Sequence, residues 1–290
     1  MRTCLIFLGA NHHAMRLSET DIERAHRLWD ELADFPASQT DGALLHLMKT
    51  MQGWLDTDNV IWVGAARLAQ GKAAKLDSLS GWRGLSVRHL VLDPVQAEIS
   101  RRAAAEQDTD PGMTTRALAD GTGKFRIHRL HDGFIDLKAF KRSGHYYAQY
   151  EVTGIRDRMF VGIPVNEDAE SFFLFDRMRQ TPRFTIRDTE IVAYAMRGLK
   201  WFQRDLLLSH GLLLATAPVT ATERRILHFL LTDRTESEIA RELGQAPKTT
   251  HKYITEILRK FGVRGRTGLL VLWLGEKPRT NVAKNELIEQ

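Results

Sequence analysis

Residues 220–275 read TATERRILHFLLTDRTESEIARELGQAPKTTHKYITEILRKFGVRGRTGLLVLWLG. This stretch contains three short amphipathic helical patterns and a fourth apolar one, separated by brief turns. Thr220 and Thr235 each stand three residues before a glutamate, which is the arrangement of a capping box at the start of a helix. Gly244 suits the left-handed residue that closes a helix, and Pro247 suits the first turn of the next one. The stretch therefore predicts a compact helix-turn-helix unit.

The same stretch carries most of the excess positive charge of the chain. It holds 10 Lys and Arg against 6 Asp and Glu, whereas residues 1–219 hold 28 against 27. A local basic excess is the electrostatic footprint of a nucleic-acid binder. A solvated basic surface would explain the charge equally well if the charge stood alone. Together with the helical pattern, it favours binding to double-stranded DNA.

Four ungapped motifs in this stretch, TATERRIL, SEIARELG, PKTTHKYITEILRKFGV and RGRT, resemble the LuxR/GerE-type helix-turn-helix family of transcriptional regulators. The resemblance implies an all-α, four-helix DNA-binding domain over residues 218–276. It also implies a homodimer on paired half-sites, with RNA polymerase as a further candidate partner. The chain departs from the family pattern at four positions that bear on the packing of the recognition helix: Ala246, Thr250, Tyr253 and Gly265.

The resemblance places the recognition helix at about residues 247–261. The base-contacting positions of the family fall on His251, Lys252 and Thr255. Lysine can donate to guanine, and threonine can contact polar base edges or a thymine methyl group. The remaining groups are expected at phosphates, which fix register without reading sequence: Lys248, Thr249, Arg259 and Lys260. For each residue taken singly, the alternative is a solvated helix face.

Residues 1–184 are predicted to form a separate α+β domain that senses a small molecule or mediates dimerisation. Helical patterns cover residues 18–35, 41–54, 95–105 and 113–119, and residues 70–81 have the composition of a loop. Strand patterns cover residues 59–68, 85–92, 125–130, 146–152, 158–165 and 171–175. This order resembles a GAF/PAS-like sensor, in which an antiparallel sheet is flanked by helices.

A variant capping box at Thr185 and Asp188 begins a long amphipathic pattern. It predicts one connecting helix over residues 185–217 that leads directly into the helix-turn-helix unit. Residues 277–290 are expected to be a polar tail. The N-terminal run MRTCLIFLGANHH is too short for a signal peptide and is interpreted as a strand or a docked tail.

Composition excludes several classes of protein. The single cysteine, Cys4, rules out an internal disulfide framework and favours a reducing, cytoplasmic location. The longest apolar window outside the N-terminus, residues 206–215, falls well short of the ~20 residues that a membrane helix needs. The chain contains no GxSxG, P-loop, HExxH or paired-cysteine motif, so we expect neither an enzyme nor a cofactor.

Possible ligand residues in the N-terminal part are aromatic. The candidates are Trp62, Trp82, Tyr146 and Tyr147. Plain core packing is the favoured alternative for each of them. His128, His131 and Asp132 could bind a metal, but a surface loop is the preferred interpretation, and no metal site is predicted.

Three kinds of input remain open. The first is a sensor of a small molecule other than an acyl-homoserine lactone. The second is an acyl-homoserine lactone receptor of the same family, which the pair Asp93-Pro94 suggests, although the expected aromatic spacings around that pair are missing. The third is a ligand-independent regulator whose N-terminal domain only dimerises. A phosphorylatable receiver domain is disfavoured, because no acidic pair follows a first apolar strand.

Overall fold

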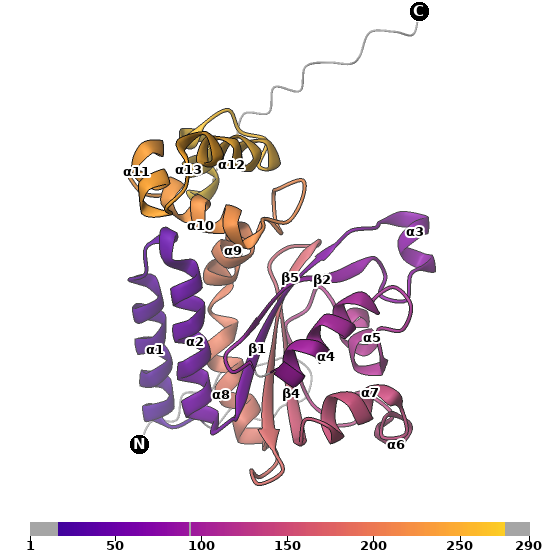
Figure 1. Cartoon of the computed structure of the whole chain (residues 1–290). Helices are drawn as coiled ribbons and strands as arrows, with labels where there is room; N and C mark the ends of the chain where they lie inside the picture. The colour runs from indigo at the N-terminus through magenta and orange to yellow at the C-terminus, as the bar shows by residue number, and fades with distance from the viewer. Residues whose placement is uncertain (1–16, 93, 276–290) are drawn as a thin grey trace, which may run out of the picture. The chain divides into compact units, whose positions relative to one another are not determined.

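The computed structural model describes residues 17–92 and 94–275 of the chain, which divides into two compact units between Leu207 and Leu208 (Figure 1). The interpretations placed on the N-terminal run, on Asp93 and on the polar tail lie outside the described residues. Among the helices that the structure describes, none is both long enough and apolar enough to cross a lipid bilayer.

A five-stranded antiparallel sheet forms the centre of the N-terminal unit, with the strand order β2-β1-β5-β4-β3. The strands are β1 (Asn59–Arg67), β2 (Trp82–His89), β3 (Arg126–Arg129), β4 (Ile155–Pro164) and β5 (Ala169–Met178). β1, β4 and β5 are almost continuously buried, because helices cover both faces of the sheet. The predicted antiparallel sheet flanked by helices is confirmed.

Helices cover the two faces of this sheet in separate groups (Figure 1). One face carries α1 (Glu19–Ala33), α2 (Thr40–Leu55) and α8 (Ile186–Arg197). The other face carries α4 (Pro94–Ala105), α5 (Met113–Asp120), α6 (Leu137–Phe140) and α7 (Gly144–Tyr146). The smaller elements are η1 (Ala37–Gln39), α3 (Gly71–Leu76) and the π-helix η2 (Tyr147–Glu151).

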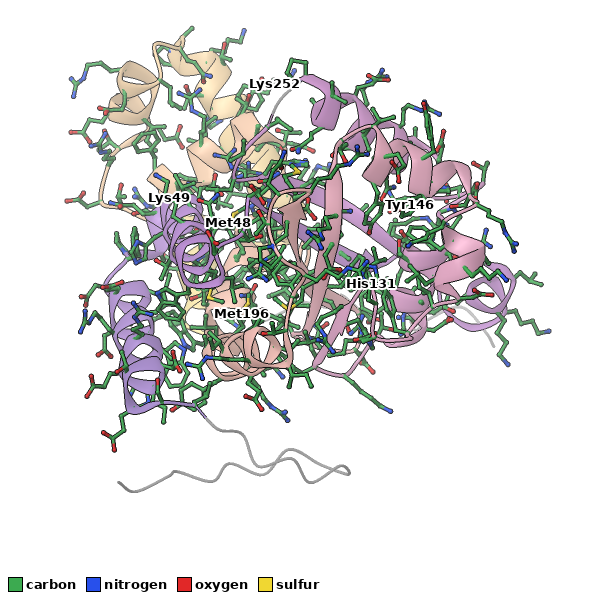
Figure 2. All side chains as sticks on the ribbon, turned by 90° about the horizontal axis from the view of Figure 1, so that it is seen from below. Met48, Lys49, His131, Tyr146, Met196 and Lys252 are labelled. Atoms are coloured by element: carbon green, nitrogen blue, oxygen red, sulfur yellow. The ribbon has the colours of Figure 1, made fainter. Side chains whose placement is uncertain are left out.

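The helices on the first face are amphipathic, as their sequence patterns predict. Ser18 begins α1 with a capping box, and its hydroxyl accepts a hydrogen bond from the backbone N–H of Asp21 at 3.1 Å. Met48 of α2 and Met196 of α8 are fully buried, whereas Lys49, the next residue along α2, is exposed (Figure 2). The buried methionines belong to the core between this helical layer and the sheet.

The strand predicted at residues 146–152 is wrong, because this segment is helical. Ser143 caps the turn by accepting a hydrogen bond from the backbone N–H of Tyr146 at 3.1 Å. The rings of Tyr146 and Tyr150 stack at 5.3 Å, and both pack against Phe140. The two β-prone tyrosines therefore pack one turn apart on a helix. A periodicity over only seven residues does not reveal this arrangement. Residues 70–81, predicted as a loop, similarly include the short helix α3.

The single connecting helix predicted over residues 185–217 is also wrong. α8 ends at Arg197, and α9 (Lys200–Ser209) is followed by turns and bends. In an unbroken helix the carbonyl of Ala195 would accept from the N–H of Leu199. Here it accepts from the indole Nε1 of Trp29 at 2.7 Å, and the Leu199 N–H turns to Met196. A side chain at Gly198 would lie 2.9 Å from the Trp29 ring, so glycine admits the inserted indole.

Four helices form the C-terminal unit: α10 (Ala221–Leu230), α11 (Glu236–Glu242), α12 (Pro247–Lys260) and α13 (Arg266–Trp273). The capping boxes predicted at Thr220 and Thr235 are both present, and Gly244 closes α11 with a left-handed φ of 63°. The helices enclose a core that includes Ile226, Leu227, Ile239, Ile254, Ile257, Phe261, Leu269 and Leu272. The all-α, four-helix prediction is confirmed.

Candidate nucleic-acid interface and small-molecule pocket

α12 presents one face to the core and the opposite face to solvent. Ile254 and Ile257 are buried, whereas His251, Lys252 and Thr255 are exposed. The helix begins at Ala246 with no side-chain cap, because alanine has no oxygen to accept from the first turn. The three positions assigned to base contact therefore lie together on the solvent face of an amphipathic helix.

Charges along this face are only partly neutralised. His251 Nδ1 lies 3.0 Å from Glu236 Oε2 at the start of α11, and this contact restrains the imidazole ring. Arg259 donates from Nε and Nη2 to Glu256, at 2.9 and 2.6 Å. Lys248 and Lys252 form no salt bridge within residues 17–92 and 94–275. The amino-terminal half of α12 thus offers the most available positive charge.

Lys260 does not belong to this surface, and its predicted phosphate contact is wrong. Its side chain is buried, and its Nζ lies 2.7 Å from Glu223 Oε2 and 3.0 Å from the Pro218 carbonyl. Helical spacing places Lys260 three residues after Ile257, on the inward face of α12. The signal in the sequence was Glu223, the capping-box glutamate of α10. Once α10 packs against α12, the buried carboxylate of Glu223 requires a cation beside it.

The ion pair with Lys260 makes the C-terminal unit sensitive to acid. Burial disfavours ionised Glu223, but hydrogen bonds from Lys260 and Thr220 outweigh that cost and lower the pKa of Glu223 below its ordinary 4.5. A carboxyl group with a lowered folded-state pKa stabilises fully above its unfolded pKa and loses this contribution as the pH falls through the folded value.

We therefore expect the free energy of unfolding of the C-terminal unit to fall as the pH drops below about 4.5, and Glu223→Gln to make this fall shallower. Urea unfolding at several pH values, followed through the NMR methyl signals of Ile226 and Ile257, measures the effect. A fall of equal steepness in the variant would contradict this role for Glu223.

The N-terminal unit contains a cavity of about 220 Å³ on the face of the sheet that carries α4 and α5. Its walls are mainly apolar and include Ile61, Leu118, Phe160 and Phe172. Trp82, one of the four predicted ligand residues, lines this cavity and is 3% exposed. A mainly apolar hollow with a few polar groups is the usual form of a small-molecule site.

The other three predicted ligand residues do not line the cavity. Trp62 is fully buried on the opposite face of β1, where its Nε1 donates to Ser171 Oγ at 3.1 Å. Successive strand residues point to opposite faces, so Trp62 cannot share the face of Ile61. Tyr146, which is labelled in Figure 2, packs in the cluster of Phe140 and Tyr150, and Tyr147 is 67% exposed.

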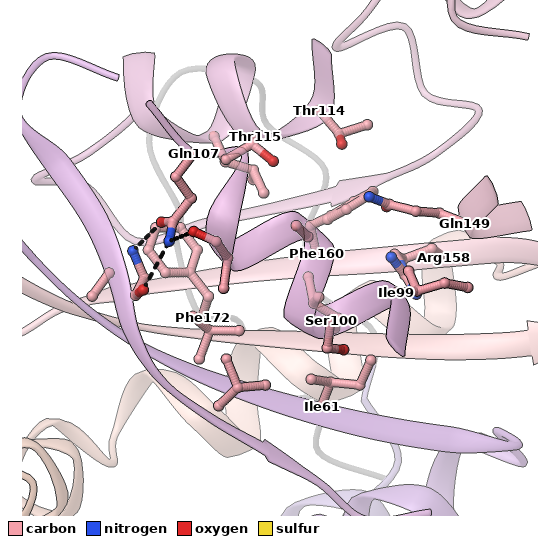
Figure 3. Close-up of a pocket in the computed structure, with 18 of the residues that line it drawn as sticks. Ile61, Ile99, Ser100, Gln107, Thr114, Thr115, Gln149, Arg158, Phe160 and Phe172 are labelled. Atoms are coloured by element: carbon pink, nitrogen blue, oxygen red, sulfur yellow. Dashed lines mark hydrogen bonds between the residues drawn. The ribbon is translucent and has the colours of Figure 1, made fainter. Parts of the chain in front are cut away.

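Sequence reasoning missed the polar residues of the cavity. Arg158 of β4 and Asp176 of β5 line it as a buried ion pair, and Gln149 of η2 lies beside Arg158 (Figure 3). A usable signal existed, because each charge directly borders a strongly apolar run within its strand: Arg158 precedes Met-Phe-Val and Asp176 follows Phe-Leu-Phe. Charged residues within such strands are seldom buried without a partner.

The histidine cluster does not converge on a common point. His131 Nδ1 lies 3.1 Å from Asp157 Oδ1, whereas His128 lies 3.9 Å from Asp132 and stacks on Phe134. Burial lowers the pKa of His128 below its ordinary value. Among the described residues, no three His, Cys, Asp or Glu side chains are grouped to hold a metal ion.

The helix-turn-helix unit has known relatives. Residues 217–273 match the family described as bacterial regulatory proteins, luxR family. The spore germination protein GerE of Bacillus subtilis (strain 168) is 38% identical over 60 residues, which is 20% of this chain and 81% of GerE. The chain belongs to the LuxR family. It is thus a LuxR-family transcription regulator, and α10 to α13 lie within the matched residues.

Solved structures also resemble this LuxR-family chain over most of its length. SdiA in complex with octanoyl-rac-glycerol has a TM-score of 0.43 and 12% identity, covering 88% of this chain and 94% of SdiA. The VqsR LBD domain from Pseudomonas aeruginosa has a TM-score of 0.42 and 12% identity, covering 66% of this chain and 98% of that domain. The fold assignment itself rests on the sheet and helices described above.

Proposed function

We propose that this LuxR-family regulator binds double-stranded DNA in a sequence-specific manner, with the outward face of α12 in the major groove. The observation that carries the proposal is the joint exposure of His251, Lys252 and Thr255 opposite the buried Ile254 and Ile257. A helix with this division of faces fits the width of the major groove and brings its polar side chains to base edges.

The groups on this face divide in the proposal between base contacts, which include His251, and phosphate contacts. Lys252 donates to guanine, and Thr255 contacts a base edge or a thymine methyl group. Lys248, Thr249 and Arg259 hold phosphates. Two copies of the chain bind paired half-sites as a homodimer, and the regulator acts in the bacterial cytoplasm.

The N-terminal unit is proposed to sense a small molecule. The cavity beside Trp82 supports this input over a ligand-independent regulator, since a domain that only dimerises needs no apolar hollow of about 220 Å³. Ligand-dependent thermal stabilisation of the full chain separates the two alternatives, because a ligand that binds only the folded state raises the melting temperature.

Lys252→Ala and Thr255→Ala are expected to weaken binding to a preferred duplex by about 1–3 kcal/mol each and to relax preference at one base pair. The duplex is first selected from a random library with the unaltered protein. Fluorescence anisotropy then gives the dissociation constants for this duplex and for single-base variants of it.

Two matched controls accompany this measurement. Arg259→Ala should weaken binding to all duplexes alike and reduce the salt slope by about 0.9, because it removes one phosphate contact. Lys49→Ala, at an exposed lysine of α2, should leave DNA affinity unchanged. Unchanged base preference in both Lys252→Ala and Thr255→Ala would rule out the assigned reading face.

A further inference from the structure

The contact between Glu236 and His251 joins the first turn of α11 to the outward face of α12. His251 Nδ1 lies 3.0 Å from Glu236 Oε2, and both residues are exposed to solvent. Within the described part of the chain, the other two positions assigned to base contact, Lys252 and Thr255, form no side-chain hydrogen bond. His251 is therefore the position on this face whose side chain is oriented by another helix.

Glu236 is not part of the capping box that begins α11. That role belongs to Glu238, whose Oε2 accepts from the backbone N–H of Thr235 at 2.7 Å and from its hydroxyl at 2.8 Å. Residues two apart on a helix do not face the same side. The carboxylate of Glu236 is thus directed away from the cap and meets His251 instead.

The core beneath the pair fixes its geometry. Ile239 of α11 and Ile254 of α12 belong to the same hydrophobic cluster. Each lies three residues after the member of the pair on its own helix, and residues at this spacing are neighbours on a helix surface. The turn between the helices is held by a hydrogen bond from the N–H of Gln245 to the Ala240 carbonyl at 2.9 Å. The packing of α11 on α12 therefore sets the separation of the two side chains.

The carboxylate decides which ring nitrogen of His251 carries the proton. A carboxylate only accepts hydrogen bonds, so the contact with Glu236 requires the proton on Nδ1. A neutral imidazole holds a single ring proton, which makes Nε2 an acceptor. Nε2 forms no hydrogen bond with the residues that the structure describes. It is thus an acceptor that a base can use.

We propose that Glu236 is a positioning residue for base specificity: it fixes His251 as an acceptor, which selects a base with an exocyclic amino group. This inference rests on the proposed DNA-binding function. In the major groove, adenine N6 and cytosine N4 donate hydrogen bonds, whereas guanine O6 and thymine O4 accept them. An acceptor on the protein therefore favours adenine or cytosine. Without Glu236 the proton can move to Nε2, and the ring can then donate to guanine or thymine.

A purely electrostatic role for Glu236 has different consequences. Negative charge near the phosphates opposes binding to every sequence, so its removal would raise the affinity for all duplexes alike. Control of the imidazole proton instead changes which base is preferred at one position. The pattern of base preference, rather than the affinity for a single duplex, distinguishes the two roles.

NMR of the DNA-free full chain, labelled with nitrogen-15 histidine and recorded at pH 8, locates the proton directly. An ordinary imidazole is neutral at this pH, and its protonated and unprotonated ring nitrogens resonate at distinct frequencies. The spectrum of His251→Asn identifies the His251 signals by their loss. The unaltered protein is expected to carry the proton on Nδ1. Glu236→Leu removes the acceptor and should shift the proton to Nε2, the form that a solvated imidazole prefers.

Fluorescence anisotropy at pH 8 measures base preference on the selected duplex and all its single-base-pair variants. His251→Ala identifies the position that His251 reads, since preference is lost there alone. At this position the unaltered protein is expected to favour adenine or cytosine about fivefold, the net value of one hydrogen bond. Glu236→Leu should reduce this preference below about twofold and leave the other positions unchanged.

Two controls accompany the binding measurement. Asp233→Asn removes the same charge from an exposed residue just before α11 that forms no ion pair within the described residues. It should keep both the proton on Nδ1 and the base preference. Duplexes in which 2-aminopurine replaces the preferred adenine, or 2-pyrimidinone the preferred cytosine, lack the amino group in the major groove and should lose the preference.

Three results would overturn the inference: the His251 proton on Nε2 in the unaltered protein, no preference for adenine or cytosine at a position that depends on His251, or the same preference there in Glu236→Leu. A protein that selects no duplex would instead contradict the proposed DNA-binding function and, with it, the base preference. Selection that depends on Lys252 and Thr255 but not on Glu236 would leave that function intact and overturn this inference alone.

Discussion

Lys260→Ala is expected to lower the free energy of unfolding of the C-terminal unit by about 3 kcal/mol, because it leaves the buried Glu223 carboxylate without its cation. Urea unfolding of the full chain, followed through the NMR methyl signals of Ile254 and Ile257, measures this loss. DNA affinity measured well below the unfolding transition should change little, since the Lys260 ammonium faces the Pro218 carbonyl and Glu223.

Arg259→Ala is the matched control for this prediction. Arg259 is the preceding residue on α12, is 67% exposed at its side chain and, among the residues that the structure describes, forms an ion pair only with the surface residue Glu256. Surface pairs of this kind contribute about 0–1 kcal/mol, so its removal should hardly change stability. If Lys260→Ala left the stability unaltered and reduced the salt slope of DNA binding, the phosphate contact that the sequence indicated for Lys260 would be correct.

Trp62→Ala is expected to lower the free energy of unfolding of the N-terminal unit by about 4 kcal/mol, as for a large aromatic residue removed from a packed core. The indole is fully buried, pairs across the sheet with Phe173 and donates to Ser171. Removing it creates a cavity and leaves the Ser171 hydroxyl without that donor. Urea unfolding followed by far-ultraviolet circular dichroism and by the methyl signal of Met196 measures the change.

Tyr147→Ala provides the comparison, because the sequence assigned Tyr147 the same ligand role and the side chain is 67% exposed. It should cost well under 1 kcal/mol. If Trp62→Ala left stability intact and instead abolished ligand-dependent thermal stabilisation of the full chain, Trp62 would belong to the ligand site and the face assigned to it on β1 would be wrong.

The helix-turn-helix unit could be predicted because its signals are local. The capping boxes at Thr220 and Thr235 and the glycine at 244 act within a few residues, and the structure retains each of them. The exposed face of α12 followed from the same local periodicity. The same periodicity places Lys260 on the inward face, but the burial of its charge could not be predicted locally, because it requires Glu223, 37 residues earlier in the chain.

The features that could not be predicted depend on contacts between distant segments. α8 and α9 separate because Trp29, 166 residues before Ala195, takes the carbonyl that a continuous helix would use. The face on which Trp62 lies depends on the register of β1 with β5. The polar end of the cavity requires β4 and β5 to bring Arg158 and Asp176 together across strands. Periodicity within one window contains none of this information.

Gln107 accepts from the N–H of Gly84 at 2.7 Å and donates to its carbonyl at 3.1 Å, and this contact has a consequence for self-association. β2 is an edge strand, and unpaired N–H and C=O groups along such an edge can template pairing with another chain. By meeting both backbone groups of Gly84, the Gln107 amide imitates a neighbouring strand at the bulged point of this edge. At this point of the edge, both backbone groups of Gly84 are therefore occupied and are not available to pair with a strand of another chain.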